Sequence, residues 1–400
     1  LQEEGNPIIF TNGDNDTFPL WYNQETEGVR TDARVCNLSY LQTDWYIDQM
    51  RRPAYDSPSL PISWTRLQYV TGTREGIPVQ PDALQQVIDY YKDSPEDLKQ
   101  MLGDNPYELK NIIRHWVLND NPDLQIFPTD SIVVTVDKEA VKRSGMMIAA
   151  DSIPDVMHIS LKGKRAVYKS EMMMLEMISQ ANWERPLYMS TTVGPDNYGH
   201  LGDNFVQEGL ACRITPFDTK QSGRTIDSER MYNNMMNKFK YGGLKENPDI
   251  YLDETVIRMC YTHRRLFNQL AQQLLKEGQK DKALKVLQRA EEEIPGSIVP
   301  HEAFYGHSLE LADAWLALGH KAEAEKLLNA VGQNAREYIE WYLSLNTQRL
   351  LQSSRECLMQ IYILNDIAKT WEPIDKKKAE TYRMEVNNYA SRCHQRGMSL

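Results

Sequence analysis

Apolar and polar positions alternate in two different patterns along the 400 residues of this chain. In the first pattern, apolar runs of strand length alternate with amphipathic stretches of helix length, which is typical of a sheet with flanking helices. From about residue 250 onward only the helical spacing continues. The pattern predicts an α/β domain over residues 1–250, with a mixed or mostly parallel sheet, followed by an all-α domain over residues 251–400.

The clearest strand–helix–strand order stands near the start of the chain. Apolar runs at residues 7–10 and 33–41 predict two strands. Between them, residues 18–27 predict a helix with Pro19 in its first turn, where the missing N–H of proline has no partner to lose. A helix between two strands at this spacing predicts a βαβ unit with parallel strands.

Further elements follow in the first domain. Helices are predicted from Thr43 or Asp44 onward and at residues 82–118 and 170–181, and strands at residues 130–136, 187–193 and 211–217. Residues 53–81 are rich in proline and predict a loop-rich segment that either wraps the domain or acts as a lid.

The second domain contains a repeat of small residues. Its first unit has Ala271, Gly278, Ala283 and Ala290, spaced by 7, 5 and 7, and its second has Ala312, Gly319, Ala324 and Val331 at the same spacing. The glycines predict helix ends, and the small residues predict close helix packing. The pattern resembles the tetratricopeptide repeat of ~34 residues. The offset of 41 residues implies an insertion around residues 296–304, and residues 335–398 predict capping helices.

Composition excludes several classes of function. The formal net charge is −11 and there is no basic run, which argues against nucleic acid as a partner. The five cysteines are scattered and lack CxxC spacing, so we predict buried free thiols and neither a zinc site nor a disulfide framework. Neither GxGxxG nor GxxxxGK[ST] occurs, so no nucleotide cofactor is predicted.

Asp14, Asn15 and Asp16 are the first candidate ligand-binding residues, because they follow the first predicted strand directly. Ligands of open α/β sheets bind at the carboxyl ends of strands, where acids can hold a cation or sugar hydroxyl groups. The same residue types also cap helices. Both interpretations stand, with capping the better single explanation.

The other candidates come from aromatic or acidic stretches. Trp21, Trp45 and Tyr46 could stack on a sugar ring or belong to the core, with Asp44 beside them. Arg30 stands in a turn where it could pair with an acid or bind an anion, although an ordinary surface turn is the better explanation. The loop at residues 194–210 contributes the candidates Asp203 and Glu208; together with His200 they match no known metal spacing, so no metal is predicted.

Residues 12–50, "NGDNDTFPLWYNQETEGVRTDARVCNLSYLQTDWYIDQM", resemble a family of large Bacteroidetes membrane proteins. "NWERPLYMSTTV" at residues 182–193 and "FVQEGLACRITPF" at residues 205–217 resemble two further blocks of the same family. Its members have an N-terminal multi-pass region and a soluble extracytoplasmic C-terminal region. The family is related to protein O-mannosyltransferases of the GT-C type, whose catalytic acid lies in the membrane region.

The resemblance implies a non-catalytic extracytoplasmic region of a membrane-embedded glycosyltransferase. It implies a location on the periplasmic face, attached to the inner membrane through a multi-pass region ahead of Leu1. The expected partner is an acceptor protein or its glycan, or a partner protein bound by the helical repeats. Two alternatives are a cell-envelope scaffold without a glycan role and a soluble enzyme acting at the loop that carries Asp14 and Asp16.

Overall fold

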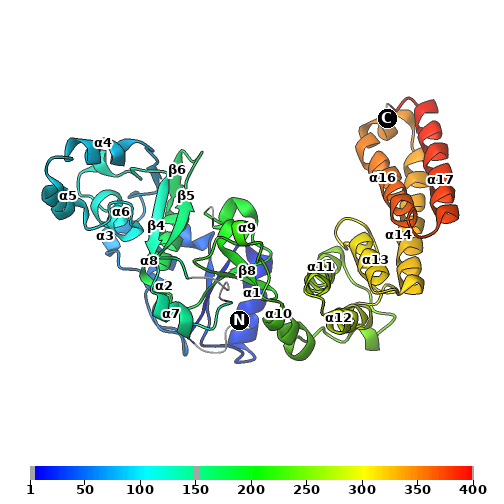
Figure 1. The fold of residues 1–400 in the computed structure, drawn as a ribbon, viewed down its shortest axis with the longest axis horizontal. Helices are drawn as coiled ribbons and strands as arrows, with labels where there is room; N and C mark the ends of the chain where they lie inside the picture. Colours follow the sequence, from blue (N-terminus) through cyan, green and yellow to red (C-terminus); the bar gives the residue numbers. More distant parts are fainter. Residues whose placement is uncertain (1–4, 148–152, 200, 399–400) are drawn as a thin grey trace. The chain divides into compact units, whose positions relative to one another are not determined.

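The computed structural model describes residues 5–147, 153–199 and 201–398. The chain divides into two compact units, residues 1–227 and 228–400 (Figure 1). The first combines sheets and helices and the second is helical, so the predicted order of an α/β fold followed by an all-α fold is confirmed. The division lies ahead of the change predicted at residue 250, because the short helix α10, Ser228–Asn233, belongs with the second unit.

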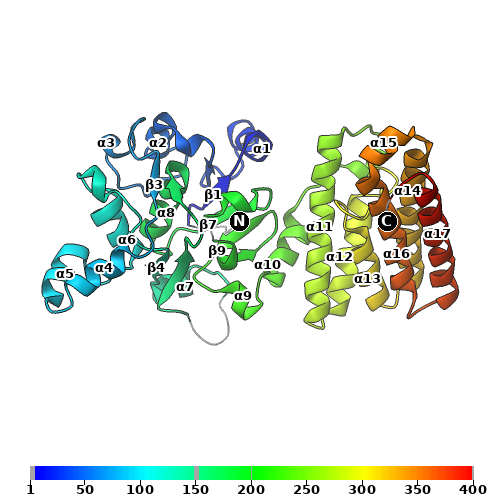
Figure 2. The same ribbon diagram turned by 90° about the horizontal axis from the view of Figure 1, so that it is seen from above.

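Five strands form the main sheet of the first unit, in the order β2-β1-β7-β9-β8. Their bounds are β1 Ile8–Thr11, β2 Arg34–Asn37, β7 Leu187–Ser190, β8 Phe205–Gln207 and β9 Ala211–Ile214. β1 is parallel to both β2 and β7, whereas β9 runs antiparallel to β7 and to β8. Figure 2 shows β1, β7 and β9 side by side. The sheet is mixed, and the predicted parallel βαβ unit is confirmed.

Helix α1 spans Asp14–Glu25 and begins ahead of the predicted start at residue 18. Gly13 has a φ of 74°, which costs little for glycine and turns the chain into the helix directly after β1. Pro19 therefore lies inside the helix, and its prediction in the first turn was wrong. The acids of the opening loop occupy the first turn instead, where the helix dipole favours negative charge.

The two faces of the sheet pack against different helices because successive strand side chains point to opposite sides. Ile8 and Phe10 join the main core, which includes the methionines of helix α8, Lys169–Gln180. Ile9 faces the other side and packs beneath Trp21 of α1. The predicted helix at residues 170–181 is confirmed, and its methionines are core residues.

The proline-rich segment at residues 53–81 is attached to α8 by two buried charged side chains. The backbone N–H and hydroxyl of Ser63 donate to Oε1 of Glu176 at 2.9 and 2.6 Å. Nζ of Lys169 lies 2.7 Å from Oε1 of Glu75. Both α8 side chains are completely buried. The segment is therefore fastened to the helix at two points along its length.

Two antiparallel ribbons complete the first unit, and they pair β3 Gly76–Pro78 with β6 Ala166–Tyr168, and β4 Ser131–Thr135 with β5 Val156–Ser160. The predicted strand at residues 130–136 is thus β4, outside the main sheet. The remaining α-helices of this unit are α2 Asp44–Met50, α3 Arg66–Tyr69, α4 Ala83–Tyr90, α5 Pro95–Leu102, α6 Leu109–Ile112, α7 Lys138–Arg143 and α9 Thr219–Ser222. The helical stretch predicted at residues 82–118 is divided among α4, α5, α6 and a further helical turn.

The second unit consists of paired helices. Their bounds are α11 Glu254–Lys276, α12 Lys280–Glu293, α13 Ser308–Ala317, α14 Lys321–Ser344, α15 Thr347–Gln352, α16 Ser354–Trp371 and α17 Lys376–Gln395. α11 packs on α12, α13 on α14, and α16 on α17 (Figure 2). No helix in the ranges described is long and apolar enough to cross a membrane.

The two predicted repeat units correspond to the hairpins α11–α12 and α13–α14. Gly278 and Gly319, with φ of 75° and 83°, end the first helix of each hairpin. After each glycine, the next N–H donates to the carbonyl five residues earlier, which is the Schellman geometry. Ala271 and Ala312, one repeat apart, are both completely buried. The small residues therefore occupy equivalent places in the two hairpins.

Residues 294–307 connect the two hairpins, as the predicted insertion requires. Arg264 of α11 is completely buried and holds this connection. Its guanidinium donates to the carbonyls of Pro300 and Ile294 at 3.0 Å and of Val299 at 2.8 Å. A single side chain thus satisfies three backbone carbonyls of an irregular segment.

The side chain of Tyr382 on α17 packs against Gly332 of α14. A Cβ built on this glycine would lie 3.1 Å from Oη of Tyr382 on α17. On the same two helices, the guanidinium of Arg392 makes two hydrogen bonds to the carboxylate of Glu340, at 2.6 and 2.7 Å. The contact combines a small residue in the helix interface with an ion pair at its edge.

Candidate ligand-binding edge of the mixed sheet

Polar residues gather where the parallel strands of the main sheet end. Thr11, Asn37 and Ser190 are the last residues of β1, β2 and β7, which lie side by side and parallel. β1 is central among these three, and the chain continues from it to β2 on one side and returns in β7 on the other. This reversal of strand order is the place where open α/β sheets bind ligands.

A buried hydrogen-bond network fixes the backbone at this edge. The hydroxyls of Thr11 and Thr17 are 2.8 Å apart, and Nδ2 of Asn37 donates to the Thr17 hydroxyl at 2.8 Å. Nδ2 of Asn37 also lies 3.3 Å from the carbonyl of Gly13. The network links β1, β2 and the start of α1, so the side chains on the turn are carried by an ordered backbone.

The three opening candidates lie on the first turn of α1 above this network. Asp16 accepts hydrogen bonds from the backbone N–H of Asn12, at 3.3 Å, and from the hydroxyl of Thr192, which follows β7. Asp14 and Asn15 are exposed. The helix N-cap is Gly13, which has no side chain. Asp16 therefore joins two strand ends, whereas Asp14 and Asn15 face outward; their ligand binding stays a prediction.

Three predicted aromatic candidates belong to one row of rings beside the edge. The row comprises Phe18, Trp21, Tyr40, Trp45 and Tyr46. Trp21 stacks on Phe18 at 5.6 Å and on Tyr40 at 6.3 Å between ring centroids, and Tyr40 lies 5.8 Å from Trp45. Sequence reasoning missed Phe18 and Tyr40. Phe18 precedes Trp21 by one helical turn, and that spacing was the available signal.

Members of the aromatic row differ in exposure. Trp45 is 54% exposed and Phe18 is 46% exposed, whereas Tyr46 is buried. The Tyr46 hydroxyl accepts a hydrogen bond from the backbone N–H of Asn37 at 2.9 Å. Burial raises the pKa of Tyr46, so its hydroxyl stays protonated at neutral pH. Tyr46 thus contributes to the structure by binding the backbone at the end of β2. Trp45 and Phe18 are exposed to solvent.

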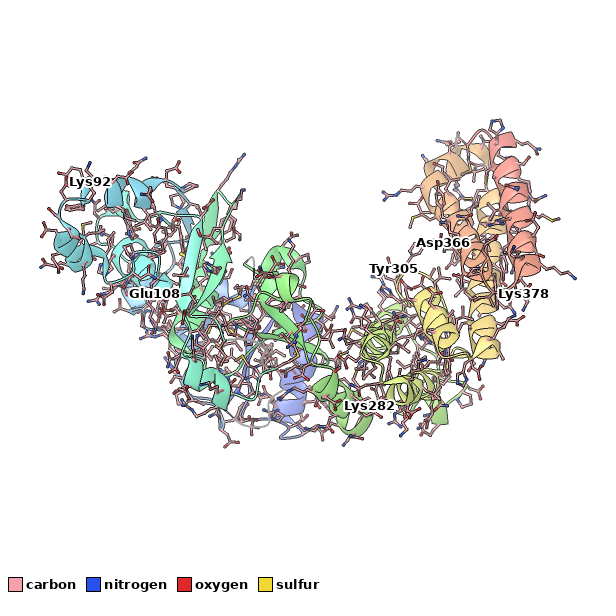
Figure 3. The ribbon with its side chains drawn as sticks, viewed as in Figure 1. Lys92, Glu108, Lys282, Tyr305, Asp366 and Lys378 are labelled. Atoms are coloured by element: carbon pink, nitrogen blue, oxygen red, sulfur yellow. The ribbon has the colours of Figure 1, made fainter. Side chains whose placement is uncertain are left out.

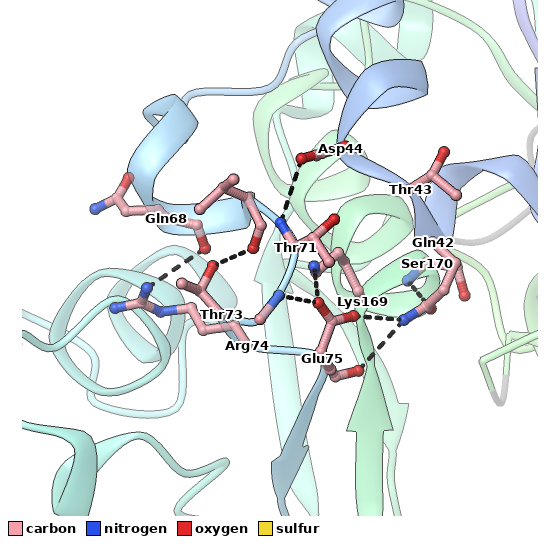
Figure 4. Close-up of polar contacts among 12 residues, drawn as sticks. Gln42, Thr43, Asp44, Gln68, Thr71, Thr73, Arg74, Glu75, Lys169 and Ser170 are labelled. Atoms are coloured by element: carbon pink, nitrogen blue, oxygen red, sulfur yellow. Dashed lines mark hydrogen bonds and ion pairs between the residues drawn. The ribbon is translucent and has the colours of Figure 1, made fainter.

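Asp44 begins helix α2 and contacts the adjacent loop, as Figure 4 shows. Its Oδ2 accepts a hydrogen bond from the backbone N–H of Thr71 at 3.3 Å, and this bond lowers the pKa of Asp44. In the same view, Glu75 binds Lys169 and accepts a hydrogen bond from the Gly72 N–H at 2.8 Å. Asp44 is therefore occupied in holding a loop.

Of the last three candidates, Arg30 and Glu208 have side-chain partners and Asp203 is exposed. Arg30 binds Asp32 at 2.7 Å within one turn, and this hydrogen bond lowers the pKa of Asp32. Asp203 is exposed just before β8. β8 is the outer strand on the opposite side of the sheet from β2. Glu208 is buried, accepts a hydrogen bond from the Tyr188 hydroxyl at 2.8 Å and lies 3.8 Å from Arg213. His200 lies outside the described residues.

The chain is thus a two-unit protein, in which an α/β unit with a polar strand edge precedes a unit of helical hairpins. It belongs to the TMEM260-associated domain 2 family, whose sequence model matches residues 2–234, more than half of the chain. The match includes all three blocks that resemble a membrane-protein family. No curated protein and no solved structure matches the chain.

Proposed function

We propose that this chain is the extracytoplasmic, non-catalytic region of a membrane-embedded glycosyltransferase of the protein O-glycosylation type. In this proposal it recognises the acceptor protein or its glycan. Membership of the TMEM260-associated domain 2 family supports the membrane-protein context. The resemblance of residues 12–50 to a family related to protein O-mannosyltransferases supports the link to glycosyl transfer.

The observation that carries recognition of a sugar is the exposed aromatic surface beside the polar strand edge. Trp45 and Phe18 are about half exposed, and exposed aromatic rings offer apolar surface on which a sugar can pack. Asp14 and Asn15 are exposed on the neighbouring helical turn and offer acceptors for hydroxyl groups. An apolar platform bordered by a few polar groups is the usual composition of a small-molecule site.

A binding titration of the full chain tests the proposal. Glycopeptides that carry a single O-linked mannose, and the same peptides without sugar, are titrated by calorimetry. We expect Trp45→Ala to weaken binding by ~2-fold to ~10-fold, the range of one lost aromatic contact. Tyr22→Ala is the matched control, because Tyr22 is an exposed aromatic of α1 outside the row. Equal effects of the two substitutions, or no binding by the unsubstituted chain, would contradict the proposal.

Removal of this region from the full-length protein tests the non-catalytic role. We expect transfer to a protein acceptor to fall, while hydrolysis of the lipid-linked sugar donor by the membrane region continues. Transfer that is unchanged by the deletion would rule out acceptor recognition. Loss of both activities would show that the region is needed for the fold of the enzyme and would argue against a separable recognition role.

A second candidate function is a protein-binding scaffold, and exposed aromatics of the helical unit favour it. Phe304 and Tyr305 lie on the connection between the hairpins and are 43% and 65% exposed (Tyr305 is labelled in Figure 3). Aromatic residues are enriched at protein interfaces. Co-purification with the full-length protein discriminates between the two functions. Partner proteins that depend on Tyr305 but not on Trp45, without glycan transfer, would favour the scaffold.

A further inference from the structure

A pocket of about 400 Å³ lies in the α/β unit at the amino end of β2, away from the polar strand edge. Its walls come from the last turns of α1, the start of β2, the end of α2 and the turn that follows α2. Trp21, Arg34, Met50 and Tyr55 are among its lining residues. The volume is within the ~300–1,000 Å³ of ligand pockets, at the end that suits a ligand of one ring.

Arg34 is the unusual member of this lining. Its side chain is buried, with 5% of the residue exposed. Nη2 donates to the backbone carbonyl of Gln49 at 2.9 Å, whereas Nη1 has no hydrogen-bond partner among the described residues. Within the same residues, no carboxylate forms an ion pair with Arg34. Buried charges in proteins are ordinarily paired, because an isolated one is costly to desolvate.

A second arginine strengthens the positive field near this pocket. Arg185 donates to the carbonyls of Asn6 and Ser59 and to the hydroxyl of Ser57, at 2.6 to 3.0 Å. All three acceptors are neutral. Burial and the nearby charge of Arg34 lower the pKa of Arg185 to about 10. Two guanidinium groups that repel each other are therefore held in one region with neutral partners.

The rest of the lining is suited to the body of a small organic molecule. Trp21 and Met50 supply apolar surface. Glu25 and Tyr55 also line the pocket and hydrogen-bond to each other, an interaction that raises the pKa of the Tyr55 hydroxyl. The pocket thus joins an apolar wall, one buried cation and one carboxylate, that of Glu25, which is engaged with Tyr55. Such a lining suits a ligand of mixed character.

We propose that this pocket binds a small carboxylate-bearing molecule, whose carboxylate pairs with Arg34 and whose body packs against Trp21 and Met50. Hydrogen bonds between a guanidinium and a carboxylate are charge-assisted and stronger than neutral ones. A sugar acid and an apolar organic acid share this chemistry. The pocket shares Trp21 with the aromatic row. It is tested at Arg34 and Ala54 and the row at Trp45, so failure of one proposal is distinguishable from failure of the other.

Calorimetric titrations of the full chain with three probes test the proposal. Sodium glucuronate represents the sugar acids, sodium phenylacetate represents the apolar acids, and glucose is the neutral match of glucuronate. We expect one of the two acids to bind with a Kd of ~0.1–10 mM and glucose to bind at least ~10-fold more weakly. Absence of binding by both acids up to ~50 mM, or equal binding of glucose and glucuronate, would overturn the proposal.

Three variants locate the binding site. Arg34→Gln is expected to weaken acid binding at least ~10-fold by removing the charge. Ala54→Phe fills the pocket and leaves Arg34 in place, so it remains informative if Arg34→Gln fails to fold because Gln49 loses its donor. Arg52→Gln, which removes the same charge from an exposed side chain, is expected to bind like the unsubstituted chain. Unchanged binding by Ala54→Phe, or an equal loss in Arg52→Gln, would overturn the assignment.

Discussion

In the helical unit, small residues at repeated positions bring helices together, whereas in the α/β unit single buried charges hold the irregular segment at residues 53–81. Ala271 and Ala312 are one repeat apart and serve the same packing purpose. Glu176 and Lys169 each serve a different contact with residues far away in sequence. The packing of small residues could be predicted from the sequence because the residues recur at a fixed spacing. The contacts of the buried charges do not recur, so the sequence gives no local sign of them.

Arg264 extends this comparison into the helical unit itself. Where the repeat is interrupted by residues 294–307, the chain uses one buried guanidinium instead of small residues. Irregular segments in both units therefore depend on single polar anchors. Loss of such an anchor should therefore destabilise the protein more than loss of a small-residue or peripheral contact.

Arg264→Met is expected to have the largest effect on stability. It removes the donor of three buried backbone carbonyls. We expect the free energy of unfolding to fall by about 3 kcal/mol, since each unsatisfied carbonyl costs ~1–3 kcal/mol and relief of the buried charge offsets part of this. Urea unfolding followed by circular dichroism measures it. Arg265→Met is the neighbouring control, and equal losses in the two variants would show that Arg264 is not an anchor.

Glu176→Leu is expected to cost ~1–3 kcal/mol, because the backbone N–H and the hydroxyl of Ser63 lose the acceptor that they share, Oε1 of Glu176. Limited proteolysis, read by mass spectrometry, should show faster cleavage within residues 53–81 than elsewhere. Glu184→Leu changes an exposed glutamate just after α8 and serves as control. Uniform cleavage along the chain in Glu176→Leu would mean that Glu176 supports the whole unit and not this segment.

Gly332→Leu tests a small residue that lies between two helices and just after the second repeat unit. The side chain would meet Tyr382 at the α14–α17 interface. We expect a loss of ~1–3 kcal/mol from overpacking, partly offset by the better helix propensity of leucine. Thermal unfolding measures the change, with Ala322→Leu on the exposed surface of α14 as control. A stability gain in Gly332→Leu would show that the interface adapts.

Arg392→Ala should have the smallest effect, at most ~1 kcal/mol, because its ion pair with Glu340 is partly exposed. The Arg392 guanidinium lowers the pKa of Glu340 below its usual value of 4.5. The pair therefore stabilises the fold above pH 4.5 and is lost as pH falls through the lowered pKa. Urea unfolding at about pH 7 and about pH 3 should show a larger difference between variant and unsubstituted chain at the higher pH. An equal difference at the two pH values would mean that the effect of Arg392→Ala comes from lost packing and not from the ion pair.

Several elements were predictable because their signals are local or periodic. The strand ahead of Gly13, the methionine-rich helix α8 and the glycine-ended hairpins all follow from spacing within a few turns. The start of α1 was predicted too late, since Pro19 was treated as a first-turn residue while Gly13 already allows the turn.

The candidate site was predictable only in part. Asp16 and Trp21 were named from the sequence, but their partners Thr192 and Tyr40 come from other strand ends. Arg34 was not named, because a lone arginine at the start of a strand carries no local sign of burial or of an unpaired nitrogen. Long-range contacts of this kind depend on the complete fold.

The glycine-ended turns have a consequence for the design of longer helical-repeat proteins from this chain. Residues 264–304 are one full period of 41 residues and carry a hairpin turn at Gly278 together with Arg264, which secures the exit segment. A gene that repeats this stretch would encode copies that each contain the glycine of the hairpin turn and the arginine that binds the connecting segment. The helical unit is thus a starting point for lengthened arrays in which each added copy contains its own turn glycine and its own buried arginine.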